Sequence, residues 1–268
     1  MTEPPAADVK ACCAAAYGSD LVALLLGDSY HPGGQALTRR LARHLELPAG
    51  SRVLDVASGP GTTATLLARD FGLQVTGVDL AAANVALARG RTAAEGLEDR
   101  VTFTVGDAER LPCPDAAFDA VVIECALCTF PDKHAAASEI ARVLRPAGRL
   151  GLTDVVAHPS RLPAELTTLS ARVACIADAL PAEGYAALLD GTGLSVTHAE
   201  RHDAAVTRMI DQIEARLTVL RMTARARLDE FGLDAARAAP VLDAARSAVG
   251  DGVLGYGLFV AEKARVGL

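Results

Sequence analysis

The chain has 268 residues, a formal net charge of -7, and a composition that is 51% hydrophobic but only 4% aromatic. This length is enough for one α/β domain with additions, and the apolar content excludes global disorder. The arginines are scattered, whereas binding to nucleic acid needs clustered Lys and Arg. We therefore expect no nucleic-acid partner.

Residues 1–5 (MTEPP) contain no basic segment followed by an apolar run, so no secretory signal is predicted. No uninterrupted apolar stretch reaches about 18 residues, the length that indicates a membrane span. Without a secretion signal, the six cysteines are expected to be thiols and not a disulfide framework. These features predict a cytoplasmic protein with no membrane partner and leave its oligomeric state open.

The predicted elements begin with helical stretches over residues 1–18 and 19–50, and short apolar strands then alternate with helical runs. The predicted strands are 52–56, 74–79, 101–105, 118–123, 149–155, 195–199 and 255–261, and the predicted helical runs are 64–71, a run ending at 90, 133–144, 162–189 broken at Pro181, and 204–250.

This alternation indicates βαβ units, which predicts a doubly wound α/β fold with a mostly parallel sheet. We expect residues 1–50 to form an N-terminal helical lid. Residues 51–268 are expected to form a single domain, with a helical insertion at about 204–250 before the last strand.

A glycine-containing loop follows the first predicted strand in the segment 55–61 (DVASGPG). Ligands bind at the carboxyl ends of strands in open α/β sheets, and glycine lets the backbone approach a ligand closely. The pattern Gly59-x-Gly61-x-x-Ala64 also satisfies the dinucleotide fingerprint. The loop alone therefore fits either a cofactor site, including a nicotinamide site, or ordinary turn glycines.

Three acids mark the ends of successive strands. Asp55 precedes the loop, where it would repel a pyrophosphate but pair with the ammonium of a sulfonium amino acid. Asp79, 24 positions later, can accept both hydroxyls of a ribose, and Asp107 can accept from an adenine amino group. Each acid alone would be an ordinary solvated strand end. The ordered set favours S-adenosyl-L-methionine over a nicotinamide cofactor.

Five stretches in this order resemble the class I S-adenosylmethionine-dependent methyltransferases: residues 53–61, 77–79, 105–108 with 111–112, 118–121 and 142–149. The resemblance spans about residues 50–155 and resumes at the last strand. It implies a seven-stranded sheet whose last strand is antiparallel. One departure is Ala57, where the family more often has Gly. The residues then expected to bind the cofactor are Tyr17, Asp55, Ala57, Ser58, Gly59, Gly61, Asp79, Leu80, Asp107, Ala108 and Glu124.

Cysteines follow the fourth and fifth strands. The segments 124–133 (ECALCTFPDK) and 174–180 (ACIADAL) resemble the arsenite methyltransferases. On that resemblance Cys125 and Cys175 are expected to ligate a trivalent metalloid through their thiolates, which are soft ligands for soft centres. The third ligating Cys of that family, before the first strand, is missing from residues 26–33. Cys12, Cys13 and Cys128 are the candidates to replace it.

Other interpretations of these residues remain open. The cysteines can instead be core thiols or line a pocket for an organic acceptor, since free Cys is often buried. His31 is either a general base for an organic nucleophile or a hydrogen-bonded surface histidine. Tyr17 and Tyr30 either cover the sulfonium by cation–π attraction or only pack.

The expected activity is S-adenosylmethionine-dependent methyl transfer to a soft metalloid, with no resident metal cofactor. The first alternative is an O-, N- or C-methyltransferase acting on a small organic molecule. A nicotinamide-dependent oxidoreductase and a non-enzymatic sensor of the cofactor are further alternatives.

Overall fold

The computed structural model describes Lys10, Tyr17 and residues 24–27, 30–168, 175–223 and 235–265. Most of the helix expected over residues 1–18 lies outside these residues, but Lys10 and Tyr17 are both helical. The elements are α3 (Gly34–Leu45), β1 (Arg52–Val56), α4 (Thr62–Phe71), β2 (Gln74–Asp79), α5 (Ala82–Ala94), β3 (Val101–Val105), β4 (Phe118–Glu124), η1 (Leu127–Thr129), α6 (Lys133–Val143), β5 (Leu144–Ala157), η2 (Pro159–Arg161), η3 (Ala164–Leu166), α8 (Ala182–Asp190), β6 (Leu194–Arg201), α9 (Asp203–Thr223), α11 (Ala235–Gly250) and β7 (Leu254–Lys263).

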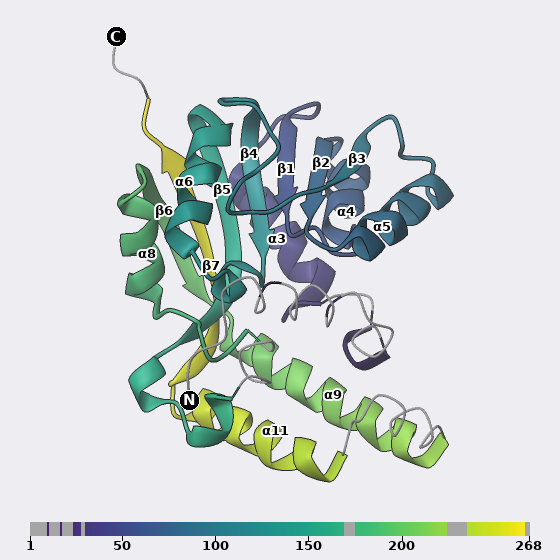
Figure 1. Ribbon diagram of the computed structural model, residues 1–268, viewed down its shortest axis with the longest axis vertical. Coiled ribbons are helices and arrows are strands. Elements are labelled where there is room, and N and C mark those ends of the chain that lie inside the picture. The colour runs from purple at the N-terminus through teal and green to yellow at the C-terminus, as the bar shows by residue number, and fades with distance from the viewer. Residues whose placement is uncertain are drawn as a thin grey trace.

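The seven strands form one sheet in the order β3-β2-β1-β4-β5-β7-β6 (Figure 1). Val53 of β1 pairs in parallel with Val75 of β2 and with Ala120 of β4, and β7 runs antiparallel to both of its neighbours. The predicted doubly wound, seven-stranded fold is confirmed. The strand order reverses between β1 and β4, so a ligand crevice is expected at the carboxyl ends of these two strands.

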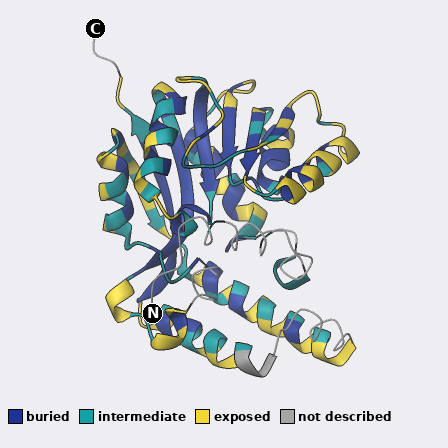
Figure 2. Ribbon diagram, viewed as in Figure 1, coloured by how far each residue is buried: buried dark blue, intermediate teal, exposed yellow. Residues whose placement is uncertain are grey.

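Successive strand residues enter two apolar cores, one on each face of the sheet. Val53 packs with α3, α4 and α5 on one face, and Leu54 packs with α6 and α8 on the other. Figure 2 shows the strands buried and the helices exposed only on their outer sides. Strands covered on both faces read as continuous aliphatic runs, which explains why the sequence shows them clearly.

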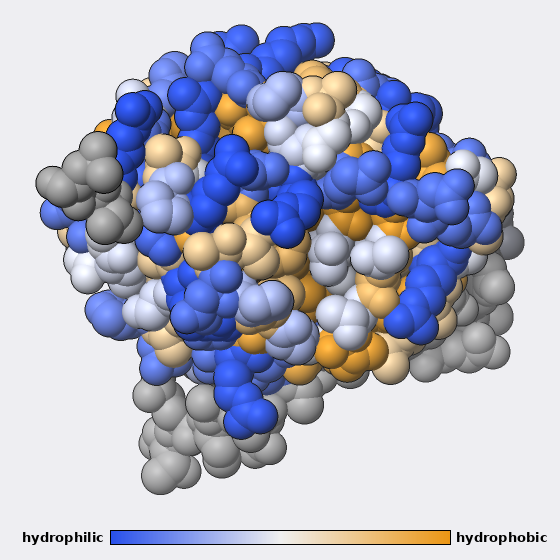
Figure 3. Space-filling model, turned by 90° about the horizontal axis from the view of Figure 1, so that it is seen from above, coloured by the Kyte–Doolittle hydropathy of each residue, from blue (hydrophilic) through white to orange (hydrophobic). Residues whose placement is uncertain are grey.

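Two long helices, α9 and α11, pack against each other beyond the carboxyl ends of the parallel strands (Figure 1). Arg246 of α11 forms ion pairs with Asp211 (2.9 Å) and Glu214 (2.8 Å) of α9. Both helices fall within the stretch that the sequence assigns to a helical insertion. The opposite end of the molecule, seen from above in Figure 3, has a largely hydrophilic surface with small apolar patches.

The helix expected over 162–189 is wrong for most of the described residues. Among the described residues of this stretch only α8 forms an α-helix, and the single 3-10 turns η2 and η3 precede it. Pro163 and Pro181 explain the difference, since proline disfavours the helical conformation of the residue before it. Leu180 instead forms an isolated bridge with Val156 of β5. None of the described helices combines the length and apolar character needed to cross a membrane.

Candidate functional site

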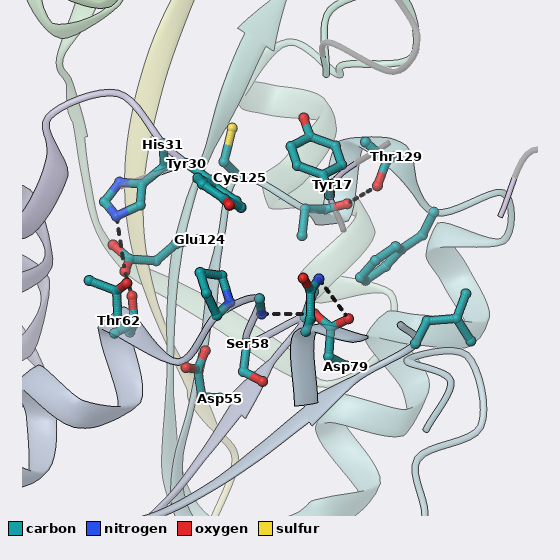
Figure 4. Close-up of a pocket in the computed structure, with 18 of the residues that line it drawn as sticks. Tyr17, Tyr30, His31, Asp55, Ser58, Thr62, Asp79, Glu124, Cys125 and Thr129 are labelled. Atoms are coloured by element: carbon teal, nitrogen blue, oxygen red, sulfur yellow. Dashed lines mark hydrogen bonds and ion pairs between the residues drawn. The ribbon is translucent and has the colours of Figure 1, made fainter. Parts of the chain in front are cut away.

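A cavity of about 160 Å³ lies at the carboxyl ends of β1, β2 and β4 (Figure 4). Ten of the residues expected at a site line it: Tyr17, His31, Asp55, Ala57, Ser58, Gly59, Asp79, Leu80, Glu124 and Cys125. Its wall also contains residues that sequence reasoning did not select: Lys10, Pro60, Thr62, Thr63, Asn84, Ala126, Thr129, Phe130 and Pro131.

Four expected residues do not line this cavity, and a fifth cannot be placed. Gly61 begins α4 behind the wall, and Ala108 packs against the second core. Asp107 accepts a 2.7 Å hydrogen bond from Lys10, which does line the cavity. Cys175 lies one layer deeper, and Cys13 is outside the described residues.

The loop between β1 and α4 adopts left-handed backbone at both ends. Gly61 has φ +79°, and a Cβ there would come within 2.8 Å of atoms of Ala88 and Phe103, so only glycine fits. Ala57 has φ +58°, which is costly for a residue with a side chain. This conformation explains why the resembling family more often has Gly at this position.

Asp79 holds the loop in place. Its Oδ2 accepts from the Gly59 amide (2.8 Å), and its Oδ1 accepts from the Ala81 amide (2.8 Å) and from Asn84 Nδ2 (3.2 Å). A carboxylate offers roughly four acceptor sites, so capacity remains for a ligand hydroxyl.

Asp55 is buried, and its Oδ2 has no hydrogen-bond partner among the described residues. Burial, followed by the nearby charges of Glu124 and Asp79, raises the pKa of Asp55 well above its usual value. An unpaired buried carboxylate on a cavity wall is a costly arrangement that a cationic ligand group relieves. The ammonium of an S-adenosylmethionine amino acid fits this requirement.

His31 is buried and lines the cavity, so its interpretation as a surface histidine is wrong. Its Nε2 lies 3.4 Å from Glu124 Oε2, and its Nδ1 lies 3.2 Å from the carbonyl oxygen of Pro32. Glu124 is fixed by hydrogen bonds from Thr38 Oγ1 (3.0 Å) and Thr63 Oγ1 (2.6 Å). The result is an imidazole oriented by an anchored carboxylate, an arrangement suited to proton transfer.

Three cysteines meet beneath the cavity, and of these only Cys125 lines it. Cys175 Sγ donates to the Cys125 carbonyl oxygen (3.3 Å), lies 3.3 Å from Tyr17 Oη, and shares hydrogen bonds with the thiols of Cys125 and Cys128. The three sulfurs do not all lie within 4.8 Å of one another. Hydrogen bonding to Cys175 and burial raise the pKa of Cys125, and burial chiefly raises that of Cys128. The structure thus brings Cys125 and Cys175 into contact in a buried thiol cluster.

Asp154 of β5 lies beside these thiols and is fully buried. Its oxygens accept from the Cys128 amide (2.9 Å) and the Val155 amide (2.8 Å). Burial, with a further contribution from Cys175, raises the pKa of Asp154 to about 7. No sequence signal selected this residue, because it reads as part of an apolar strand.

Comparison with known proteins identifies the family. Residues 54–152 match the family described as Methyltransferase domain. The 27-O-demethylrifamycin SV methyltransferase of Amycolatopsis mediterranei (strain S699) is 36% identical over 198 residues, which are 68% of this chain and 72% of that protein. Methyltransferase GfsG of Streptomyces halstedii is 40% identical over 129 residues, covering 48% of this chain and 46% of that relative.

Among solved structures, the [4+2]-cyclase SpnF matches with a TM-score of 0.80 and 26% identity over 99% of both chains. The chain spans about half the length of several curated relatives it matches, but nearly three quarters of the rifamycin enzyme. The similarity to that enzyme, together with the strand order and the loop at β1, shows that the chain belongs to the class I S-adenosylmethionine-dependent methyltransferases.

Proposed function

We propose that the chain methylates a hydroxyl group of a small organic molecule, with His31 as the general base. The observation that carries this proposal is the buried His31–Glu124 pair in the same cavity as Asp55 and Asp79. The rifamycin relative is named as the methyltransferase of an O-demethylated compound. That name supports a hydroxyl group as the acceptor here as well.

In this proposal the two acids would hold the amino-acid moiety and the ribose of the cofactor. Asp55 Oδ2 pairs with the ammonium, and the remaining acceptor capacity of Asp79 takes the ribose hydroxyls. The loop residues 57–59 approach the cofactor with their backbone, and Leu80 and Tyr17 cover it. Asp107 acts at the rim through its pair with Lys10. When bound, the cofactor supplies an electrophilic methyl group on a sulfonium.

The protein's chemical contribution is proximity and proton removal. The Pro32 carbonyl oxygen accepts from His31 Nδ1–H, which leaves the lone pair on Nε2 to take the hydroxyl proton. Glu124 Oε2 lies 3.4 Å from Nε2 and would stabilise the imidazolium that results. His31 would hold the proton that the hydroxyl loses when its oxygen is methylated.

The cavity wall favours an apolar organic acceptor. Tyr30, Ala126, Phe130 and Pro131 line the cavity beside Cys125. Metalloid methylation is less well supported, because ligation needs several thiolates. Hydrogen bonds from Cys125 and Cys128 lower the pKa of Cys175, but hydrogen bonding to Cys175 and burial raise the pKa of Cys125, and burial raises that of Cys128. The separation of the three sulfurs also disfavours a shared soft centre.

A second candidate function is a [4+2] cyclisation. The similarity to the [4+2]-cyclase SpnF over 99% of both chains favours it. In that case the cavity would hold a diene against an alkene, and His31 would have no proton to remove.

One assay separates these functions. The protein is incubated with methyl-labelled S-adenosylmethionine and, separately, with three substrates: 27-O-demethylrifamycin SV, a molecule that carries a diene and an alkene, and arsenite. The proposal predicts S-adenosylhomocysteine and a labelled methyl ether, both lost in His31→Gln. Labelled methylarsenic that disappears in Cys125→Ser would replace it with the metalloid function, and a cyclised product without cofactor turnover would replace it with the cyclase.

A further inference from the structure

A second group of ligand-type side chains lies between α3 and β6, apart from the cavity. His44 is in the last turn of α3, and His198 and Glu200 are two residues apart on β6. The rings of His44 and His198 stack with centroids 4.2 Å apart and planes 22° apart. Among the described residues, these three form the one group of His, Cys, Asp and Glu whose ligand atoms all lie within 4.8 Å of one another.

The strand places His198 and Glu200 on the same face, since side chains two positions apart in a strand point the same way. The pairing with β7 shifts register between Val196 and His198, and such irregularities re-aim the side chains next to them. In the sequence, His44 comes before β1, whereas β6 comes after β1 to β5. Only the packing of α3 brings its histidine to this edge strand.

A separate observation points to a ligand at this place. His198 Nε2 is buried and has no hydrogen-bond partner among the described residues. It lies 3.6 Å from Glu200 Oε2, and His44 Nε2 lies 3.9 Å from Glu200 Oε1, both beyond normal hydrogen-bond distance. The His198 side chain is 39% exposed, but this nitrogen is covered, lies near a carboxylate and belongs to a ring that stacks on a second imidazole, so it is free to bind a cation.

We propose that His44, His198 and Glu200 bind a divalent transition metal, with Zn²⁺ the best match. Two imidazole nitrogens and one carboxylate oxygen are ligands that Zn²⁺ takes at about 2.0–2.2 Å. Ligand atoms around a tetrahedral ion of that size lie roughly 3.3 Å apart. The observed nitrogen–oxygen spacings of 3.6 and 3.9 Å are close to this value, but the two imidazoles, which stack in this structure, would have to turn so that a nitrogen of each points at the ion.

The surrounding residues complete the site. Arg40 donates to Glu200 through Nε (2.5 Å) and Nη2 (2.6 Å), which orients the carboxylate while leaving some of its acceptor capacity for an ion. His202 Nε2 lies 2.9 Å from Glu200 Oε1 and also holds the carboxylate in place, but it does not belong to the group of three ligands. The ion would tie α3, which also carries Thr38 of the cavity, to the edge strand of the sheet. The role is structural and does not depend on the proposed reaction.

The test uses Zn²⁺ alone with the full chain after chelator treatment. We expect saturable binding of one ion and a higher melting temperature, because a ligand that binds only the folded state stabilises it. His44→Ala and His198→Ala should each weaken Zn²⁺ affinity by ~100-fold or more. His134→Ala, which changes an exposed histidine on α6, should leave it unchanged. Equal affinity in His198→Ala and His134→Ala would overturn the proposal.

A spectroscopic measurement on the unaltered chain does not depend on the variants folding. Co²⁺ bound by imidazole and carboxylate gives tetrahedral visible bands without sulfur-to-metal charge transfer, and we expect that spectrum. Charge-transfer bands would place the ion at the buried thiols, and no spectral change would show no site. Either result would overturn the assignment to α3 and β6.

Discussion

The two ends of the cavity differ in the sequence distance between the residues that touch one another. At the cofactor end, Asp79 contacts Ala81, Asn84 and Gly59, at separations of 2, 5 and 20 residues. At the acceptor end, Glu124 contacts Thr63 and Thr38 across 61 and 86 residues. The cofactor end is therefore a local motif, whereas the acceptor end exists only after the chain has folded.

The two ends also place their acids differently. Asp79 is held by backbone amides from the loops after β1 and β2, and the Oδ2 of the nearby Asp55 has no hydrogen-bond partner among the described residues. At the acceptor end, Glu124 orients a histidine and Asp154 is sealed beneath the thiols. We infer that Asp55 and Asp79 bind the cofactor at one end. At the other end, Glu124 and Asp154 affect which neighbouring groups hold a proton. Substitutions at each end should therefore change different quantities.

The largest effect is expected from His31→Gln. Removing a general base should lower kcat for methyl transfer by ~10²–10⁴-fold. Calorimetric titration should show unchanged affinity for S-adenosylmethionine, because His31 belongs to the acceptor end. His134→Gln is the matched control at an exposed position. Full activity in His31→Gln would mean that the acceptor end works by proximity alone.

The next largest effect is the pH dependence of the free energy of unfolding that Asp154 should cause. Its folded pKa of about 7 lies above the ordinary 3.8, so the folded state holds the proton more tightly. The stabilisation is complete below about pH 4 and is lost as the pH rises toward 7, a change of about 4 kcal/mol in the free energy of unfolding.

Urea unfolding across that pH range measures this change. Asp154→Asn should flatten the profile, and it should be less stable at pH 5 because its amide group faces a backbone N–H donor. Asp251→Asn, at an exposed position, should keep the pH dependence of the unaltered chain. If both variants behave alike, Asp154 does not titrate in this range.

A smaller effect is expected at the cofactor end. Asp79→Ala should weaken S-adenosylmethionine binding by about 1.5–3 kcal/mol, the usual contribution of a hydrogen bond to a charged group. Isothermal titration measures it, with the exposed Asp99→Ala as control. NAD should bind to none of these proteins, and NAD binding without a response to S-adenosylmethionine would contradict the cofactor assignment.

The smallest effect compares the left-handed residues at the two ends, Ala57 (φ +58°) and Cys125 (φ +54°). Ala57→Gly should raise the free energy of unfolding by at most about 1 kcal/mol, because relief of strain is offset by greater freedom of the unfolded chain. Cys125→Gly relieves similar strain but loses the packing of a sulfur, so it should be destabilising. Thermal unfolding of both variants would show whether the signs differ.

The same contrast explains what the sequence could predict. Aliphatic strands ending in Asp55 and Asp79 are local patterns, and they predicted the doubly wound sheet and indicated where a cofactor would bind. Thr38 and Thr63 are ordinary helix residues by sequence, and only tertiary packing aims them at Glu124. The burial of His31 was missed for the same reason, since its partner lies on a distant strand.

The cysteines show what the resemblance to the arsenite methyltransferases could and could not predict. It correctly grouped Cys125 with Cys175, because both follow strands that open at the same end of the sheet. It did not indicate the chemistry of the group, which depends on the burial, pKa and spacing of the sulfurs. The helix expected after β5 was broken at Pro181, and α8 begins directly after that residue. The part before the break was wrong for the described residues because apolar periodicity was weighed above Pro163.

The position of β7 has a consequence for how the chain folds during synthesis. β7 follows every other strand in the chain, yet it lies between β5 and β6 in the sheet. While the ribosome is still making α9 and α11, the emerged β6 has no strand to pair with, and β5 has one open edge. Unpaired edges are templates for association with other chains. The nascent protein therefore passes through a window in which it is prone to aggregate, and this window closes when β7 inserts.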